Sequence, residues 1–297
     1  MSNSYNNKKK NKTIKFKKST CNPSKSNPLN FTCFSTSQII NLKNIWNLRH
    51  PSESINSNNP QEIWYSFRER FSEICSTERC WLKQEFFKRN LGPEILSYTF
   101  APKAPPSWNK NINEWLSSTD ITKVMKLYEE KYPHFAFIGP SPIDFNKKLI
   151  GGDCVWEDLC NFNLQNMLSK GKKKIGIVFN TDPHNKDGEH WIAVFIDTSS
   201  NPHPYFFYFD SNGDKAPEEV KNFSNKVISE AKNLGIDMKF IENHPTEHQQ
   251  GNTECGIYVI YFITELLSGN KTYDYFLNNS IPDNQMVKFR EIFFDLS

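Results

Sequence analysis

The 297-residue sequence predicts an α+β fold, with a central, mostly antiparallel sheet flanked by helices and a helical appendage on its N-terminal side. Three closely spaced runs rich in β-branched and aromatic residues predict strands at 173–182, 189–197 and 204–211. The loops between these runs are short, which favours antiparallel neighbours because a parallel return needs a longer crossover. Helical patterns before and after the strands predict the layers that cover the sheet.

The N-terminal segment is basic and poor in apolar residues. Its first 27 residues carry eight lysines and no acidic residue, so without them the net charge of +3 becomes about −5. Such a segment buries too little apolar surface to offset its ordering entropy, and we predict a disordered basic tail over residues 1–36. A solvated tail is the simplest interpretation of the Lys-rich stretch 8–18, and contact with nucleic acid is the alternative.

Composition also sets expectations for compartment and cofactors. No apolar run approaches the ~18 to 20 residues of a membrane span, and the N-terminus has no apolar signal-peptide stretch, so we expect a soluble intracellular protein without a membrane partner. Seven cysteines without a CxxC motif predict reduced thiols in a reducing compartment. No cysteine pair has the spacing and nearby histidine of a zinc site, so we predict neither a metal nor a cofactor.

The chain then divides into an appendage, a linker and a main domain. Apolar residues recur at helical spacing at 37–50, 60–74 and 80–90, which predicts a helical appendage over residues 37–100 without chemistry of its own. Three prolines within 101–110 exclude a helix or a central strand and predict a linker. The main domain is expected at 111–297.

The remaining elements of the main domain follow from similar patterns. A helix is expected after residue 120, a short strand at 135–139 and a helical stretch at 157–171. Pro217 in a first turn and Gly235 as a stop predict a helix over 216–235, and 238–244 resumes the sheet. The run 255–269 is apolar on nearly all sides, which predicts a buried helix ended by Gly269. A last amphipathic helix is expected at 280–296.

Cys255 stands where a polar turn becomes this buried helix. Unpaired N–H groups and the dipole at a helix start favour an anion, and they therefore favour a nucleophilic thiolate. Gly256 removes a side chain beside the sulfur, which would let a substrate carbonyl approach. A thiolate still needs one partner that protonates a leaving amine and another that stabilises an oxyanion.

Three residues could be those partners. His190 heads one predicted strand, and Asp210, at the end of the next, could hold the imidazole in one tautomer. Gln249 could form an oxyanion hole with the backbone N–H of Cys255. The competitors are His248 for the base and Asn212 for the acid. Each residue alone also has a plainer structural explanation, as a buried thiol, a capping histidine or a turn former, so catalysis and structure remain open alternatives at this point.

The order His, Asp, Gln, Cys, with "HW" at the base and "Q…TECG" at the nucleophile, resembles the ubiquitin-like-protein protease superfamily, which includes SUMO proteases and adenovirus protease. The resemblance implies His190 as general base, Asp210 as its orienting partner, Gln249 as oxyanion donor and Cys255 as nucleophile. The "WLSSTD" stretch is similar to the opening of SUMO-protease domains. It implies that Trp115 and Trp191 clamp the substrate backbone and leave room only for glycine, which gives a preference for Gly-Gly before the cut.

The similarity extends to the polyprotein-processing protease of large DNA viruses, of the African swine fever virus type. The shared patterns are "NTD…G-HW-A-F-D", "HQ…TECG-Y" and a closing "MxKFR", whereas Asp210 replaces an Asn of that type. The resemblance implies a cysteine endopeptidase that cuts after Gly-Gly and matures viral structural polyproteins, in the host cytoplasm or the virion. The alternatives are a deubiquitinase or de-SUMOylase acting on host conjugates, an acetyltransferase on the same scaffold, and an inactive module that binds Gly-Gly tails.

One residue beside the nucleophile has no explanation in the sequence. Glu254 precedes Cys255 directly, and a neighbouring negative charge opposes formation of a thiolate.

Overall fold

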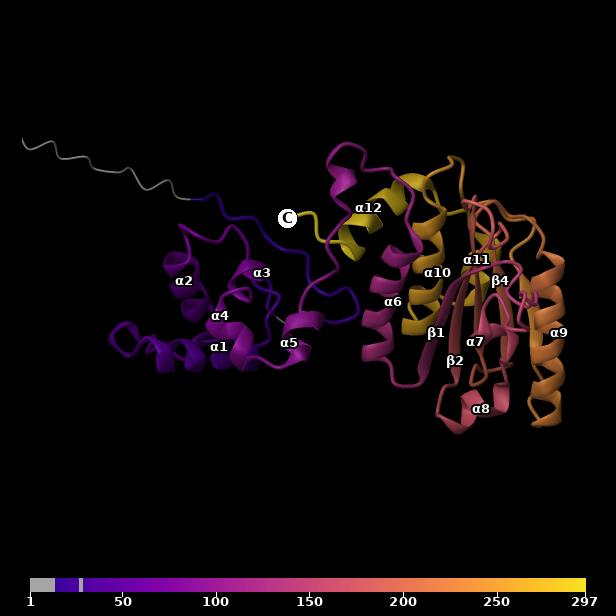
Figure 1. Ribbon diagram of the computed structural model, residues 1–297, viewed down its shortest axis with the longest axis horizontal. Coiled ribbons are helices and arrows are strands. Elements are labelled where there is room, and N and C mark those ends of the chain that lie inside the picture. Colours follow the sequence, from indigo (N-terminus) through magenta and orange to yellow (C-terminus); the bar gives the residue numbers. More distant parts are fainter. Residues whose placement is uncertain (1–13, 27–28) are drawn as a thin grey trace, which may run out of the picture. The chain divides into compact units, whose positions relative to one another are not determined.

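The structure, a computed structural model, describes residues 14–26 and 29–297, which belong to two compact units. The first contains the residues up to Lys103 together with Ile292–Ser297, and the second contains Ala104–Glu291 (Figure 1). The division after Lys103 falls inside the expected linker 101–110. The last residues of the chain lie in the first unit, whereas we expected them in a domain spanning 111–297.

The first unit is helical and has an aromatic core of its own. A capping box starts its first helix, because Ser35 accepts a hydrogen bond from the backbone of Gln38 while the Gln38 side chain accepts one in return. Buried aromatic side chains, among them Trp46, Phe67 and Trp81, pack together between the helices. The helices are α1 (Thr36–Arg49), α2 (Pro60–Arg70), α3 (Glu78–Trp81), α4 (Glu85–Asn90) and α5 (Pro93–Tyr98).

The described part of the N-terminal segment is packed into this unit. The backbone N–H of Ile14 donates to the carbonyl of Ser72 at 3.1 Å, and the ring of Phe16 meets Trp64 edge-on with 5.7 Å between centroids. The prediction of a disordered tail through residue 36 is therefore wrong for the described residues. The prediction weighed the lysine content of this segment and overlooked aromatic side chains such as Phe16, which pack into the unit. Within the stretch 8–18, residues 14–18 belong to the first unit and 8–13 lie outside the described residues.

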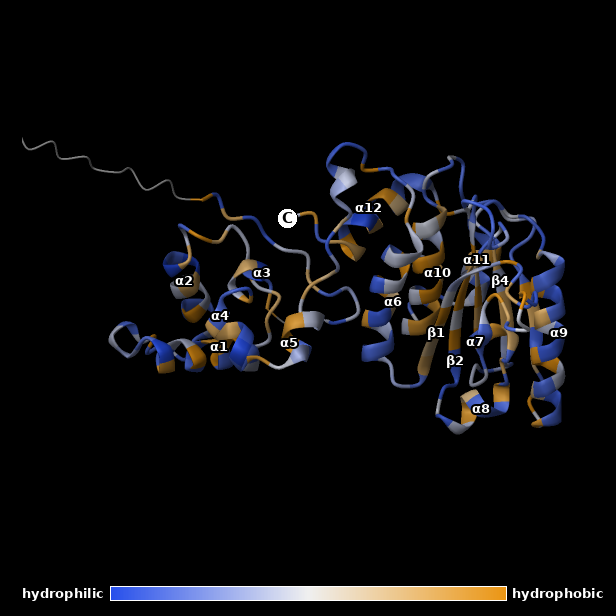
Figure 2. Ribbon diagram, viewed as in Figure 1, coloured by the Kyte–Doolittle hydropathy of each residue, from blue (hydrophilic) through white to orange (hydrophobic). Residues whose placement is uncertain are grey.

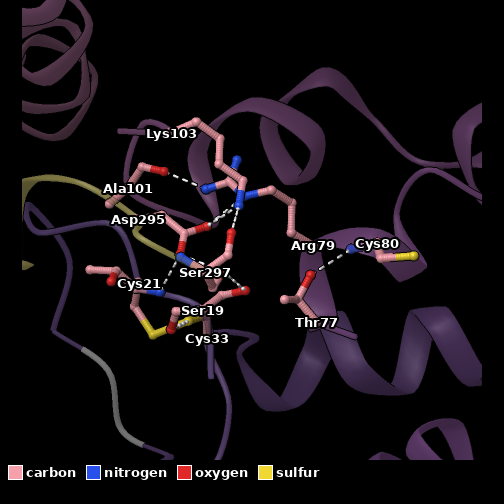
Figure 3. A network of polar contacts seen from close by, with 11 residues as sticks. Ser19, Cys21, Cys33, Thr77, Arg79, Cys80, Ala101, Lys103, Asp295 and Ser297 are labelled. Carbon is pink, nitrogen blue, oxygen red and sulfur yellow. Dashed lines mark hydrogen bonds and ion pairs between the residues drawn. A yellow bond between two sulfur atoms is a disulfide. The ribbon is translucent and has the colours of Figure 1, made fainter. Parts of the chain in front are cut away.

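The C-terminal residues complete the first unit through Asp295, which is only 1% exposed. Its carboxylate accepts hydrogen bonds from the backbone of Thr20 at 3.1 Å, from Arg79 at 2.9 Å and from the Ser297 hydroxyl at 2.7 Å (Figure 3). Lys103 lies 3.4 Å away. Burial raises the pKa of Asp295, but these hydrogen bonds and positive charges outweigh it and lower the pKa below its usual value. Asp295 therefore joins both ends of the chain within one unit.

All seven cysteines lie in the described residues, and six of them are paired. We predicted reduced thiols, whereas the structure joins the six in three disulfides between residues close in the sequence, and Cys255 alone is free. The absence of a CxxC motif was a poor guide, because local turns bring together cysteines 5 to 12 positions apart. The pairs are Cys21–Cys33, Cys75–Cys80 and Cys154–Cys160.

The second unit is built on a five-stranded mixed sheet with the strand order β1-β2-β3-β4-β5. The inner pairs β2·β3 and β3·β4 are antiparallel, as expected from the short loops, and the α+β fold class is confirmed. The outer pairs β1·β2 and β4·β5 are parallel, because helical crossovers connect them. The strands are β1 (Phe135–Pro142), β2 (Lys174–Asn180), β3 (Trp191–Asp197), β4 (Tyr205–Phe209) and β5 (Lys239–Glu242).

Helices cover both faces of this sheet (Figure 1). Helix α9 (Glu218–Asn233) packs its apolar stripe on one face, while α6 (Ser118–Lys131) and the largely apolar α10 (Cys255–Ser268) pack on the other (Figure 2). Gly176 of β2 permits the close approach of α10, since a Cβ there would lie 2.9 Å from the side chain of Ile263. The remaining helices are α7 (Glu157–Cys160), α8 (Leu164–Ser169), α11 (Tyr273–Asn278) and α12 (Asp283–Phe293).

None of the helices within the described residues combines the length and apolar character needed to cross a membrane.

Candidate active site

Cys255 is the first residue of α10, and it is 2% exposed and free. The helix start therefore presents its unpaired N–H groups beside the sulfur. Gly256 has a different surrounding from the one we expected. A Cβ at Gly256 would lie 2.8 Å from the Cβ of Leu116, so the missing side chain makes room for Leu116 and not for a substrate carbonyl. Gly256 thereby lets the 115–116 segment pack against the start of α10.

The pairing of β3 with β4 brings His190 and Asp210 together. Ala193 of β3 is opposite Phe209 of β4 in an antiparallel register, so the residue before β3 and the residue after β4 lie at the same end of the sheet. There, His190 Nε2 donates to Asp210 Oδ1 at 2.7 Å, and Cys255 is near enough to His190 to affect the pKa of its ring. The ring nitrogen that remains, Nδ1, is the one left for the sulfur.

The electrostatics of His190 favour the protonated imidazole. Burial alone lowers the pKa of His190, but hydrogen bonds to Asp210 and Cys255, together with the charges of both, raise it to about 10. The protonated ring is thus stabilised by a carboxylate and a sulfur. This arrangement suits an imidazolium that pairs with a thiolate and later donates its proton.

Asp210 is itself held rigidly by a buried amide that sequence reasoning missed. The side chain of Asn243 accepts from the backbone N–H of Asp210 at 2.8 Å and donates to the Asp210 carbonyl at 2.7 Å. The backbone N–H of Asn212 donates to Asp210 Oδ1 at 2.8 Å, so Asn212 serves the turn and does not replace Asp210 beside His190. Nothing in the sequence around residue 243 predicts this contact, because Asp210 follows another strand, β4, and lies far away in the sequence.

His248, the competing base, is buried on the inner side of the loop. Its ring centroid lies 5.2 Å from that of Phe209, and its Nδ1 accepts the backbone N–H of Ile281 at 3.3 Å. Burial lowers the pKa of His248 to about 4, which leaves the ring neutral at physiological pH. The structure gives His248 a packing role, and it is His190 that lies beside Asp210.

The orientation of Gln249 is set by Ser211. The Ser211 hydroxyl donates to Gln249 Oε1 at 2.9 Å, so Nε2 is the donor end of the amide. Nε2 donates one hydrogen to the Gly251 carbonyl at 2.8 Å, and its second hydrogen remains available. The Asp283 carboxylate accepts the backbone N–H of Gly251 at 2.7 Å and fixes this part of the loop. Ser211 and Asp283 are therefore further supports of the site that the sequence did not reveal.

The charge of Glu254 is neutralised by Arg290 of α12, which is 0% exposed. Arg290 Nε donates to Glu254 Oε2 at 2.7 Å, and its other nitrogens donate to the carbonyls of Thr253 at 3.0 Å and Glu114 at 2.8 Å. The guanidinium also lies over the ring of Trp108, 4.7 Å from its centroid. Arg290 stands in the "MxKFR" pattern noted in the sequence, and it joins the turn before Cys255 to the segment that carries Trp115.

Two cavities of the second unit meet beside Trp115, which is 44% exposed. One, of about 580 Å³, is lined by His190, Asp210 and Gln249. The other, of about 530 Å³, is lined by Trp191 on the far side of Trp115. The indole N–H of Trp191 donates to the carbonyl of Leu116 at 2.9 Å, which fixes the two tryptophan segments beside each other. The five predicted site residues therefore line two neighbouring cavities, and Trp115 lines both of them.

Comparisons with known proteins agree with this geometry. Residues 162–296 match the family described as the Ulp1 protease family, C-terminal catalytic domain. A putative thiol protease of Acanthamoeba polyphaga mimivirus is 28% identical over 294 residues, which cover 92% of each chain. A SUMO-1 cysteine protease of African swine fever virus is 28% identical over 195 residues, covering 63% of this chain and 70% of that protein. The crystal structure of an African swine fever virus protease has the same fold, with a TM-score of 0.67, 22% identity and coverage of 96% and 98% of the two chains.

Proposed function

We propose that this chain, a cysteine protease whose residues 162–296 match the Ulp1 protease family, cleaves protein substrates after a Gly-Gly pair and thereby matures viral structural polyproteins. The observation that carries the proposal is that Trp115 lines both the cavity of the His190–Asp210 pair and the neighbouring cavity that is lined by Trp191. A slot between two indoles admits a backbone without side chains. The relatives named above are viral thiol or cysteine proteases, which supports a viral substrate.

In the proposed reaction, the Cys255 thiolate attacks the carbonyl carbon of the second glycine. Gln249 Nε2 and the backbone N–H of Cys255 stabilise the oxyanion, and His190 gives its proton to the leaving amine. A thioester remains. Water then attacks the thioester, His190 accepts a proton from that water, and the glycine carboxylate leaves. Asp210 holds the imidazole in the orientation that both proton transfers need.

Cleavage of a quenched fluorescent peptide containing Gly-Gly-Ala tests this proposal, with a Gly-Ala-Ala peptide as its matched control. We expect cleavage of the first peptide only. A SUMO or ubiquitin conjugate tests the second candidate, which the similarity to a SUMO-1 cysteine protease of African swine fever virus favours. Acyl transfer from an acyl-CoA to a peptide, or binding of a Gly-Gly tail without turnover, would instead support a transferase or an inactive binding module. Contact of the stretch 8–18 with nucleic acid stays a prediction.

Replacing Trp115 with Ala is expected to relax the glycine requirement. The substitution removes one wall of the groove, so the Gly-Ala-Ala peptide should gain kcat/KM relative to Gly-Gly-Ala by at least about 10-fold, which is the scale of one or two methyl groups in a tight pocket. Tyr65, an exposed aromatic residue of the first unit, provides a control as Tyr65→Ala. An unchanged ratio of the two kcat/KM values in Trp115→Ala would remove Trp115 from the specificity site.

Asp210→Asn is expected to move the alkaline limit of activity to lower pH. Asp210 and Cys255 together raise the pKa of His190 to about 10, against the effect of burial, so the neutral amide should let that pKa fall. The protonated ring is the acid for the leaving amine, and kcat/KM should therefore decline at lower pH than in the wild type. The stability that protonated His190 contributes, complete below its ordinary pKa of 6.5 and lost as the pH rises through about 10, should shrink as well.

A profile of kcat/KM from neutral pH to above pH 10 measures this shift. Asp214→Asn is the matched control, since Asp214 lines the same cavity and no hydrogen bond joins it to His190 in the described contacts. If the alkaline limit of kcat/KM is the same in Asp210→Asn as in the wild type, Asp210 does not control the pKa of His190.

A further inference from the structure

The chain carries a Gly-Gly pair of its own, at positions 151 and 152, and it is the only one in the sequence. The pair lies at the tip of a hairpin that connects β1 to α7 in the second unit. A bridge between Lys148 and Cys154 closes the hairpin, and Leu149 makes two backbone hydrogen bonds across it, with Asp153 at 2.8 Å and with Gly152 at 3.0 Å. Residues 146–153 are all exposed.

This tip is held by little except its own backbone. No atom comes within 4 Å of the position that a Cβ would take on Gly151 or Gly152, and the side chain of Ile150 is fully exposed. Both glycines have left-handed backbone angles, with φ of 118° and 95°, so the turn depends on their lack of side chains. Exposed tips with few packed side chains open locally at small cost, and they are preferred sites of proteolysis.

We propose that the peptide bond between Gly152 and Asp153 is a cleavage site for a second copy of this protease. The proposal rests on the proposed Gly-Gly specificity. In the opened hairpin, Gly151 and Gly152 of one copy enter the groove of the other, beside Trp115 and Trp191. The Cys255 thiolate forms a thioester with the Gly152 carbonyl as the bond to the Asp153 nitrogen breaks, and His190 protonates that nitrogen. Water hydrolyses the thioester and leaves Gly152 with a free carboxylate.

Cleavage after Gly152 would change the substrate-binding part of the protein and not its reacting residues. His190, Asp210, Gln249 and Cys255 all remain on the C-terminal fragment, whereas Trp115 stays on the N-terminal fragment. The parallel pairing of β1 with β2 holds the fragments together without a covalent bond. The new N-terminus at Asp153 lies close in sequence to Val155 and Trp156, which line the same cavity as Trp115 and Trp191. Self-cleavage therefore acts on the substrate groove and leaves the reacting residues intact.

The test uses a tagged Cys255→Ala chain as the target and the wild-type protein as the enzyme, mixed under native conditions. We expect fragments that end at Gly152 and begin at Asp153, identified by intact mass. No disulfide of the structure crosses this bond, so the fragments separate on a denaturing gel without reductant. The Gly-Gly-Ala peptide is assayed in the same mixture, which reports on the enzyme independently of the target.

Two variants of the target sharpen the test. Gly152→Ala should lower the rate of cleavage at least about 10-fold, because the groove excludes a side chain at this position. Gly171→Ala is its matched control, since Gly171 is also exposed, has φ of 75° and has no atom within 4 Å of its Cβ position. That target should be cut as fast as the parent chain, and its melting temperature controls for the strain of the substitution.

Each outcome decides the matter. An intact target in a mixture that cleaves the peptide overturns self-cleavage and leaves the Gly-Gly specificity standing. A peptide that is also left intact overturns both. Equal cleavage of the Gly152→Ala and Gly171→Ala targets, or fragments that end elsewhere, places the cut outside the hairpin tip and likewise overturns the proposal.

Discussion

A Cys255→Ala protein should lose nearly all hydrolysis of the Gly-Gly-Ala peptide while it keeps its fold. The thiolate is the group that forms the thioester, and neither His190 nor Gln249 can replace it, so a rate loss on the order of 10⁵- to 10⁶-fold is expected. Oxyanion stabilisation and substrate binding alone leave only a small residual rate. The measurement is single-turnover cleavage of the peptide at enzyme concentrations high enough to detect that residual rate.

A second readout separates chemistry from folding. Cys255 is buried at the start of α10, so removing its sulfur also removes a packed atom and should cost about 1 kcal/mol or slightly more in stability. Thermal melts should therefore remain close to those of the wild type. Peptide binding, followed by fluorescence anisotropy, should persist in the Cys255→Ala protein. Wild-type turnover in this variant would show that another residue is the nucleophile.

The second large effect is expected for Arg290→Met. Removing the guanidinium leaves the carboxylate of Glu254 buried without its ion-pair partner, and it leaves the carbonyls of Thr253 and Glu114 without their donor. Breaking one side of a buried ion pair typically costs about 3 to 5 kcal/mol, a large part of the stability of a domain. Chemical denaturation, monitored by tryptophan fluorescence, should show a much lower midpoint of unfolding.

A double variant tests the electrostatic cause of this loss. Glu254→Gln with Arg290→Met removes both charges, and it should recover most of the lost stability, because the cost comes from the unpaired charge. Lys288→Met is the matched control on the same helix. It removes an exposed positive charge, and such surface changes usually stay within about 0.5 kcal/mol. Equal destabilisation in the single and double variants would assign the role of Arg290 to packing.

Those residues of the candidate site whose positions follow from local sequence patterns could be predicted. His190, Asp210 and Cys255 were predicted at the ends of strands and the start of a helix, and the structure has them there, with His190 and Asp210 joined by the β3–β4 register. The helical and strand runs of the main domain follow the same local rules. The functional roles of these residues stay predictions until the substitutions above are measured.

Other features depend on contacts that no local pattern contains. Asn243 supports Asp210 from 33 residues away, and Arg290 reaches Glu254 across 36 residues. The parallel pairing of the outer strands depends on how their helical crossovers pack on the sheet. The short loops between the central strands carry no information about that packing. The packed N-terminal segment escaped prediction because its composition was dominated by lysine, while its anchoring came from a few aromatic side chains.

The position of Arg290 and Asp295 after Cys255 affects the order in which the two units become complete during synthesis. Domains usually fold from the N-terminus as they leave the ribosome. Here Asp295 closes the first unit, and Arg290 neutralises the charge beside Cys255. Both residues are translated after Cys255. A nascent chain that has just exposed Cys255 therefore lacks both contacts, and neither the first unit nor the turn before Cys255 is finished until residues 290–295 have also emerged.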